Sequence, residues 1–342
     1  MPEYIWNLSD LKNIKKNGYK VFSCFSCGGG SSMGYKLSGY DVIGNCEIDP
    51  RMNKVYIENH HPRYNYCMGV QEFKKLENLP EELFELDILD GSPPCSTFSM
   101  AGQRERAWGK MKKFNEGQAY QVLDDLFFEF IEVANKLRPK IVVAENVKGM
   151  LAGNAKGYIN MVIKEFNRIG YDIQIFSLNA ATMGVPQKRE RVFFIARRRD
   201  LKLPSLQLSF SEPVITYGSF KDIHYQPINK STMGYKRWLR RSRRDKNIGD
   251  IVKRTEGGKI SQFNAMFVKD HRVANTLTAG ERPVRFDVPG RISDRDIKII
   301  QTFPQDYNFL DQDVQYICGM SVPPLMMKRI SEQIYRQMLS RE

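Results

Sequence analysis

Long apolar runs are absent from this 342-residue chain, and no stretch approaches the length needed to span a membrane. The amino terminus lacks a signal-peptide pattern. Cysteine is sparse and scattered, at positions 24, 27, 46, 67, 95 and 318, and Cys24-Phe25-Ser26-Cys27 has no second pair of ligands downstream. We therefore expect no membrane segment and no metal site. Scattered free thiols are typical of a reducing cytoplasm.

Acidic residues are few relative to basic ones. The 39 Asp and Glu against 52 Lys and Arg leave a formal charge of +13, which favours a polyanionic partner such as nucleic acid. Internal repeats and low-complexity tracts are also missing. The length and the 42% hydrophobic content suit one large α/β unit or two domains, each with a real core.

The stretch from Asp87 to Ser99 is the most informative in the chain. A short strand pattern runs into Gly91-Ser92-Pro93-Pro94-Cys95, and two prolines stop both helix and strand pairing. Cys95 is thereby predicted at the carboxyl end of a strand, the edge where open α/β sheets bind ligands. It could be a nucleophile or a buried structural cysteine, and its Pro-Pro setting favours the nucleophile.

A second pattern indicates a nucleotide-like ligand. A strand at 21–25 runs into Ser26-Cys27-Gly28-Gly29-Gly30, and a helix pattern follows. The next strand, 41–46, ends in Glu47, about 20 positions after the glycines, where an acid can bind a ribose diol. The alternatives are a plain flexible turn for the glycines and a helix-start acid for Glu47.

Further elements follow from periodicity. We expect helices at 8–16, 123–137 and 158–169, and strands near 66–70 and at 141–144, 172–178 and 192–196. Glu145-Asn146-Val147 ends one strand, and Gln187-Lys188-Arg189-Glu190-Arg191 precedes another. Residues 100–119 read as a long basic loop, which includes Arg104 and Arg106.

In this order, the Pro-Pro-Cys, Glu-Asn-Val and Gln-x-Arg-x-Arg segments closely resemble those of the DNA cytosine-5 methyltransferases. Further matching segments are Phe25 to Gly30, Glu47, Thr276-Leu277-Thr278, Gln301-Thr302-Phe303-Pro304 and Gly319 to Pro324. The resemblance covers nearly the whole chain. It implies an S-adenosylmethionine-dependent, Rossmann-like α/β sheet with helices on both faces, and a smaller target-recognition domain. We place the catalytic domain at 1–198, the recognition domain at 199–310 and a segment returning to the catalytic domain at 311–342.

The resemblance also implies a mechanism. Cys95 would add to carbon 6 of a flipped cytosine, because the covalent adduct makes carbon 5 nucleophilic. Arg189 would favour the thiolate. Glu145 would hydrogen-bond N3 of the base and Arg191 would contact O2, as preorganised stabilisation of developing charge.

Cofactor residues are implied in the same way, for the adenine, ribose and methionine parts of S-adenosylmethionine. They are Phe25, Ser26, Gly28, Gly29, Gly30, Glu47, Ile48, Val70, Gly91, Ser92, Pro93, Leu126, Ser321 and Val322. Three positions depart from the family pattern. Cys27 replaces a glycine, Met68-Gly69-Val70 lacks an acid, and Met320 replaces an asparagine.

An arginine cluster around Trp238 is a candidate for phosphate contacts, with a solvated face as the alternative. Its members are Arg237, Arg240, Arg241, Arg243 and Arg244. The expected partner is double-stranded DNA, with a separately acting restriction endonuclease as a candidate. We expect a monomer in the cytoplasm, associated with the nucleoid when bound to DNA. A tRNA methyltransferase and a catalytically silent DNA-binding protein are the alternatives, although no Cys-Phe-Thr motif of the tRNA branch is present.

Overall fold

The computed structural model describes residues 2–94, 126–151, 155–258 and 265–340. The chain divides into two compact units. We call the first the sheet unit; it comprises Ser9–Asn179, Glu190–Ser209 and Met326–Glu342. We call the other the second unit; it comprises Met1–Leu8, Ala180–Arg189 and Phe210–Leu325. Among the described helices, none is both long and apolar enough to cross a bilayer.

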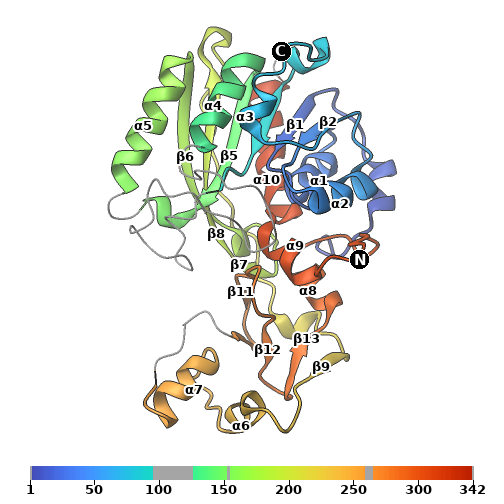
Figure 1. The fold of residues 1–342 in the computed structure, drawn as a ribbon, viewed down its shortest axis with the longest axis vertical. Coiled ribbons are helices and arrows are strands. Elements are labelled where there is room, and N and C mark those ends of the chain that lie inside the picture. The colour runs from blue at the N-terminus through green and yellow to red at the C-terminus, as the bar shows by residue number, and fades with distance from the viewer. Residues whose placement is uncertain (1, 95–125, 152–154, 259–264, 341–342) are drawn as a thin grey trace. The chain divides into compact units, whose positions relative to one another are not determined.

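The sheet unit is built on a seven-stranded sheet in the order β3-β2-β1-β4-β5-β8-β6 (Figure 1). Its strands are β1 Lys20–Cys24, β2 Asp41–Cys46, β3 Tyr64–Tyr66, β4 Ile88–Gly91, β5 Ile141–Val147, β6 Tyr171–Asn179 and β8 Glu190–Arg198. Strand β8 pairs antiparallel with both β5 and β6, whereas the other pairs are parallel. The amino-terminal end of β8 therefore lies at the same edge as the carboxyl ends of β1, β4 and β5.

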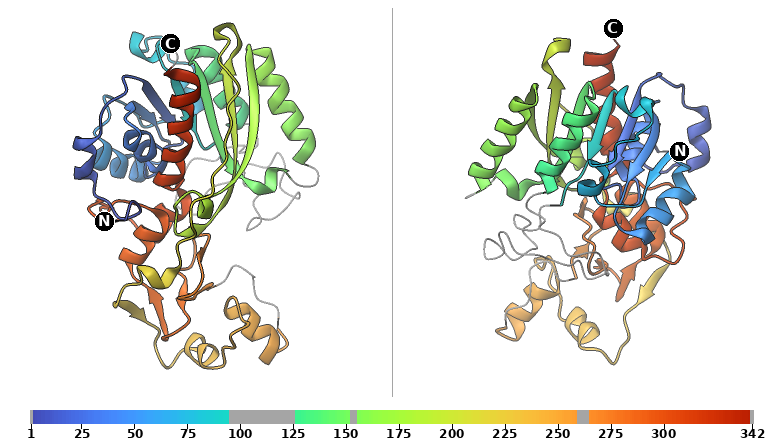
Figure 2. Two further views of the ribbon diagram at one scale, coloured as in Figure 1. Left: turned by 180° about the vertical axis from the view of Figure 1, so that it is seen from behind. Right: turned by 45° about the horizontal axis from the view of Figure 1, so that its top comes forward.

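Helices cover both faces of this sheet. They are α1 Gly30–Leu37, α2 Pro50–His60, α3 Val70–Phe73, α4 Leu126–Leu137, α5 Ala155–Arg168 and α10 Pro324–Ile334. On one face, α3, α4 and α5 pack against alternate strand residues such as Phe22, Leu89 and Val142 in one buried core. On the other, Tyr35 of α1 bonds to Asp90, and α10 runs along this face in the view from behind (Figure 2). The predicted Rossmann-like fold class is confirmed.

The second unit holds a four-stranded sheet and a two-stranded one, ordered β10-β12-β13-β9 and β11-β7. The strands are β7 Gln187–Lys188, β9 Tyr225–Pro227, β10 Phe267–Val268, β11 Ala274–Asn275, β12 Val284–Arg285 and β13 Gly290–Ile292. The helices are α6 Met233–Leu239, α7 Ile248–Thr255, α8 Asp294–Gln301 and α9 Val314–Met320. Helices α6 and α7 pack against the four-stranded sheet through a small core of Trp238, Ile248, Ile251, Phe267 and Val284.

Two predicted elements differ from the structure, one in its position and one in its type of helix. The strand expected near 66–70 is shorter and earlier, at Tyr64–Tyr66, and Val70 instead begins α3 because Gly69 accepts the first helical N–H bonds. The helix expected at 8–16 is a 3-10 helix, Leu8–Asn13. The helix predicted at 123–137 is described from Leu126 to Leu137, and the loop at 100–119 lies outside the described residues.

Candidate active site

The turn before the predicted nucleophile is fixed at the end of β4. Gly91 is level with Cys24 of β1 and Ala144 of β5 in the sheet register. A Cβ on Gly91 would lie 2.6 Å from the Phe130 ring, so only glycine lets β4 approach α4 so closely. The backbone oxygen of Pro93 accepts a 3.0 Å hydrogen bond from Nδ2 of Asn146 on β5. Cys95 lies just outside the described residues, two positions after this anchor.

Glu145 and Arg191 form an ion pair at the same edge. Nε of Arg191 lies 2.8 Å from Oε1 of Glu145, and the side chains are 15% and 11% exposed. They meet because β5 and β8 are antiparallel neighbours, with Val147 opposite Arg191. An acid and a fixed cation, mostly shielded from solvent, therefore stand together beside the strand end that leads to Cys95. This pair can present a donor and a positive charge to one polar edge of a ligand.

Arg189 lies in the second unit and is 2% exposed. Its guanidinium donates to the backbone oxygens of Leu277 (2.9 Å) and Gly319 (3.0 Å). Gln187 supports the same segment by accepting the N–H of Leu277 at 2.9 Å. These contacts join the Gln-x-Arg-x-Arg, Thr-Leu-Thr and Gly319 segments within one unit. The predicted action of Arg189 on the Cys95 thiol stays a prediction.

The glycine turn is tightly packed. Phe25 and Cys27 have φ of 53° and 44°, a left-handed conformation that explains why glycine is usual at the Cys27 position. Gly29 also has positive φ, 71°, and a Cβ there would lie 2.1 Å from Nε2 of the buried His60. Ser26 and the three glycines are buried, and α1 begins at Gly30.

Glu47 sits where the sequence predicts a ribose contact. It is 6% exposed, and its two carboxylate oxygens accept the N–H groups of Cys27 (2.8 Å) and Asp49 (2.9 Å). Burial raises the pKa of this carboxyl, although those backbone bonds oppose the rise. Each oxygen keeps a further acceptor position, so the carboxylate fits a ligand that brings hydroxyl donors.

The remaining predicted cofactor residues fall in both units. Ile48 is half-buried beside Gly69, Val70 and Leu126 are buried, and the Phe25 ring lies 6.2 Å from that of Phe130. Ser321 and Val322 are buried in the second unit, where Oγ of Ser321 donates to Ile317. Met320, by contrast, is 44% exposed.

Sequence reasoning missed three sets of polar residues that support this edge. The first is Asn146, part of the quoted motif but given no role. The second is an amide network, buried at Asn45 and Asn53, in which Asn45 donates to Ser26 (3.1 Å) and forms a closed set of bonds with Asn53 and the exposed Asn65. The third is Asp90. A polar residue inside an apolar strand pattern was the available signal, because buried polar groups need partners.

The predicted arginine cluster of the second unit contains two arginines that are paired within the protein and three that are exposed. Arg237 is bonded to Glu256 through two nitrogens, at 2.9 and 2.8 Å. The guanidinium of Arg241 lies 3.3 Å from the centre of the Trp238 ring and donates to the oxygen of Phe286. Arg240, Arg243 and Arg244 are exposed. Arg104 and Arg106 lie outside the described residues.

The chain belongs to the C-5 cytosine-specific DNA methylase family, whose model matches residues 19–336. The type II methyltransferase M.FnuDI of Fusobacterium nucleatum is 32% identical over 191 residues, covering 56% of this chain and 50% of that protein. M1.HphI of Haemophilus parahaemolyticus is 27% identical over 338 residues, covering 91% and 85%. The chain thus spans about half the length of the first relative and most of the second.

Solved structures share the fold. A DNA modification methyltransferase encoded within an E. coli prophage superposes with a TM-score of 0.65 at 21% identity, covering 94% of this chain and 99% of that one. Spodoptera frugiperda DNMT2 gives a TM-score of 0.64 at 17% identity, covering 93% and 100%. The family match confirms the resemblance to DNA cytosine-5 methyltransferases that the motifs indicated.

Proposed function

We propose that this protein methylates carbon 5 of cytosine in a specific double-stranded DNA sequence, with S-adenosylmethionine as the methyl donor. The observation that carries the proposal is the Glu145–Arg191 pair, at the edge where Asn146 anchors the Pro-Pro turn before Cys95. Family membership supports the class of reaction. The residues at the carboxyl ends of β4 and β5 support the location of the active site there.

The chain's own residues have distinct tasks in this reaction. The Cys95 thiolate would bond to carbon 6 of a cytosine turned out of the duplex, and carbon 5 then becomes electron-rich. Glu145, when it carries a proton, would donate to N3, and Arg191 would hold O2. Both side chains are already held at this edge by their 2.8 Å contact, and the entering base would replace part of that contact.

S-adenosylmethionine supplies the methyl group when it is bound. Glu47 fits its ribose hydroxyls, because the acid is buried, held by two backbone N–H groups and still able to accept. The close-packed turn at Gly28 to Gly30 and the rigid end of β4 would line the rest, with Phe25, Ile48, Val70 and Leu126 on the apolar side.

The finer assignments belong to this proposal as well. The catalytic domain would span 1–198, the recognition domain 199–310 and the returning segment 311–342. Ser321 and Val322 would complete the cofactor pocket. The protein would act as a cytoplasmic monomer, with a restriction endonuclease as a separate partner.

Transfer of labelled methyl groups tests the proposal. Purified full-length protein is offered the labelled cofactor with double-stranded DNA or with tRNA. We expect label in DNA, none in tRNA, and none with Cys95→Ala, which should still bind DNA. DNA that carries 5-fluorocytosine should form a covalent adduct only when Cys95 is present. Label in tRNA alone, or an adduct with Cys95→Ala, would overturn the proposal.

A further inference from the structure

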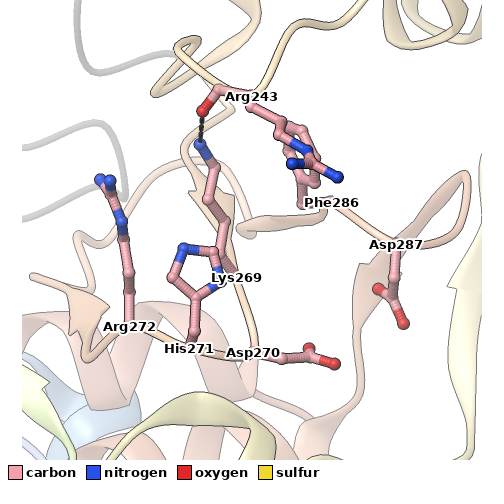
Figure 3. Close-up of a pocket in the computed structure, with 7 residues that line it drawn as sticks. All are labelled: Arg243, Lys269, Asp270, His271, Arg272, Phe286 and Asp287. Carbon is pink, nitrogen blue, oxygen red and sulfur yellow. Dashed lines mark hydrogen bonds between the residues drawn. The ribbon is translucent and has the colours of Figure 1, made fainter.

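The second unit contains two adjoining hollows that the sequence did not indicate. One has a volume of about 510 Å³ and is lined by Arg243, Lys269, His271, Arg272 and Phe286, with two acids beside them (Figure 3). The other, of about 250 Å³, shares Lys269 and Arg272 with the first and adds Lys188 and Lys246. We call the two together the basic groove.

The two acids that line the groove are already neutralised by cations outside it. Asp270 pairs with Lys221 at 2.6 Å. Asp287 pairs with Lys221 at 3.0 Å and with Arg285 at 2.7 Å. Burial alone would raise the pKa of Asp287, but these two cations hold it below its ordinary value. The charge of the groove's own cations therefore remains uncompensated by its acids.

Lys269 differs from the other cations because its ammonium is used inside the protein. It is 7% exposed and donates to the backbone oxygens of Arg243 and Asp245, both at 2.8 Å. Figure 3 shows the first of these bonds. The Asp245 carboxylate in turn accepts from the N–H of Ser242 at 2.6 Å and from Arg254 at 2.7 Å. Lys269 thus fixes the loop that carries Arg243.

The exposed cations of the groove are spread over both hollows. Arg243 and Arg272 line the larger one, and Arg272, Lys188 and Lys246 line the smaller; all four are exposed. No ion pair occupies Arg243 or Arg272 among the residues that the structure describes. Several cations spread over two adjoining hollows fit a polymer with repeated anionic groups better than one small anion.

We propose that the basic groove binds the phosphates of one DNA strand, with Arg243 and Arg272 as contacts and Lys269 as a positioning residue. This inference rests on the proposed function and adds residues outside the predicted arginine cluster. It also excludes Arg237 and Arg241 as phosphate contacts. Arg237 is already ion-paired with Glu256, and Arg241 already stacks on the Trp238 ring.

Salt-dependent DNA binding tests the groove. Affinity of the full chain for cognate and non-cognate duplexes is measured at several salt concentrations. Arg243→Ala and Arg272→Ala should each weaken binding to all duplexes and flatten the slope of log K against log salt by roughly 0.9. Arg237→Ala is the matched control, and its slope should match the wild type. Unchanged slopes for both Arg243→Ala and Arg272→Ala would overturn the proposal.

Two further arms separate the alternatives. Lys269→Met should weaken DNA binding about as much as Arg243→Ala does. The double variant Lys269→Met/Arg243→Ala should bind DNA no more weakly than either single variant. If the losses of the two single variants added in full, Lys269 would not act by positioning Arg243. Inorganic pyrophosphate replaces DNA in a thermal-shift assay, and a shift at micromolar concentration that Arg272→Ala abolishes would make this a small-anion site instead. If the protein methylates DNA but the groove variants leave the salt slopes unchanged, the groove proposal is wrong and the proposed function stands. If the groove variants change the slopes but the protein transfers no methyl group to DNA, the proposed reaction is wrong and the groove proposal stands.

Discussion

Asn146 is the residue that we expect to control the position of the turn before Cys95 without taking part in the chemistry. Its Nδ2 holds Pro93, and its Oδ1 accepts the N–H of Val147 at 2.8 Å. Asn146→Ala should lower kcat about tenfold, because loss of about 1–2 kcal/mol of hydrogen bonding loosens the turn before Cys95. Cofactor binding, measured by calorimetry, should stay unchanged. Asn135→Ala, on the exposed side of α4, is the control; equal kcat values for the two variants would contradict this role.

Asp90 is the buried acid that should make stability depend on pH. It is 2% exposed and accepts from Ser23 (2.9 Å) and Tyr35 (3.3 Å). Burial raises its pKa to about 7, and nearby Glu145 adds to the rise. The folded chain therefore holds a proton that the unfolded chain releases near pH 4, so stability falls as pH rises from roughly 4 to 7.

Urea unfolding between pH 5 and 8 measures this effect. The difference between a pKa of about 7 and one of roughly 3.9 corresponds to as much as about 4 kcal/mol across the full window. Asp90→Asn keeps the shape and a hydrogen-bond acceptor but cannot titrate, so its stability should fall less with pH. Parallel pH profiles for the two proteins would show that Asp90 does not titrate in this range.

Glu47 allows binding to be separated from chemistry. The expected ribose contact is the same in ground and transition states, so Glu47→Ala should weaken cofactor binding more than it slows transfer at saturating cofactor. Glu47→Gln keeps one acceptor oxygen and should lose less. Titration of the cofactor by calorimetry, beside single-turnover rates, gives both numbers. Unchanged affinity with a large loss of turnover would contradict the assignment.

At the scale of elements, the apolar stripes were the most predictable feature. The helix predicted at 123–137 is α4 over its described part, Leu126–Leu137, and the strand predicted at 141–144 lies within β5, because burial of apolar side chains decides both. The reversed strand β8 between β5 and β6 could not be read from the chain, since its pairing joins residues far apart in sequence. For the same reason it could not be predicted which arginines near Trp238 are paired within the protein, as Arg237 and Arg241 are.

The α6–α7 part of the second unit depends on Trp238. This side chain is 5% exposed in a small core, and its Nε1 donates to Arg285 at 2.9 Å. Trp238→Ala should destabilise this unit by about 3–5 kcal/mol. The neighbouring Leu239 is 58% exposed, and Leu239→Ala should cost less than about 0.5 kcal/mol. Thermal unfolding followed by circular dichroism compares them, and similar midpoints would contradict the packing described.

For the whole molecule, the charge of +13 and the family match both favour the DNA partner proposed above. The motifs identified the family correctly, because they are short, local segments of the sequence. Of the cations in the basic groove, only Arg243 was predicted as a phosphate contact, since the others come from segments around 188, 246 and 270 that only folding brings beside it.

The central claim is that this chain methylates cytosine at carbon 5 within a fixed DNA sequence. The gene is expressed in a host that lacks cytosine methylation, and 5-methylcytosine is mapped across the genome at base resolution. We expect methylation at nearly every copy of one short sequence and at background level elsewhere, and none with Cys95→Ala. A genome without 5-methylcytosine, despite abundant folded protein, would contradict the claim.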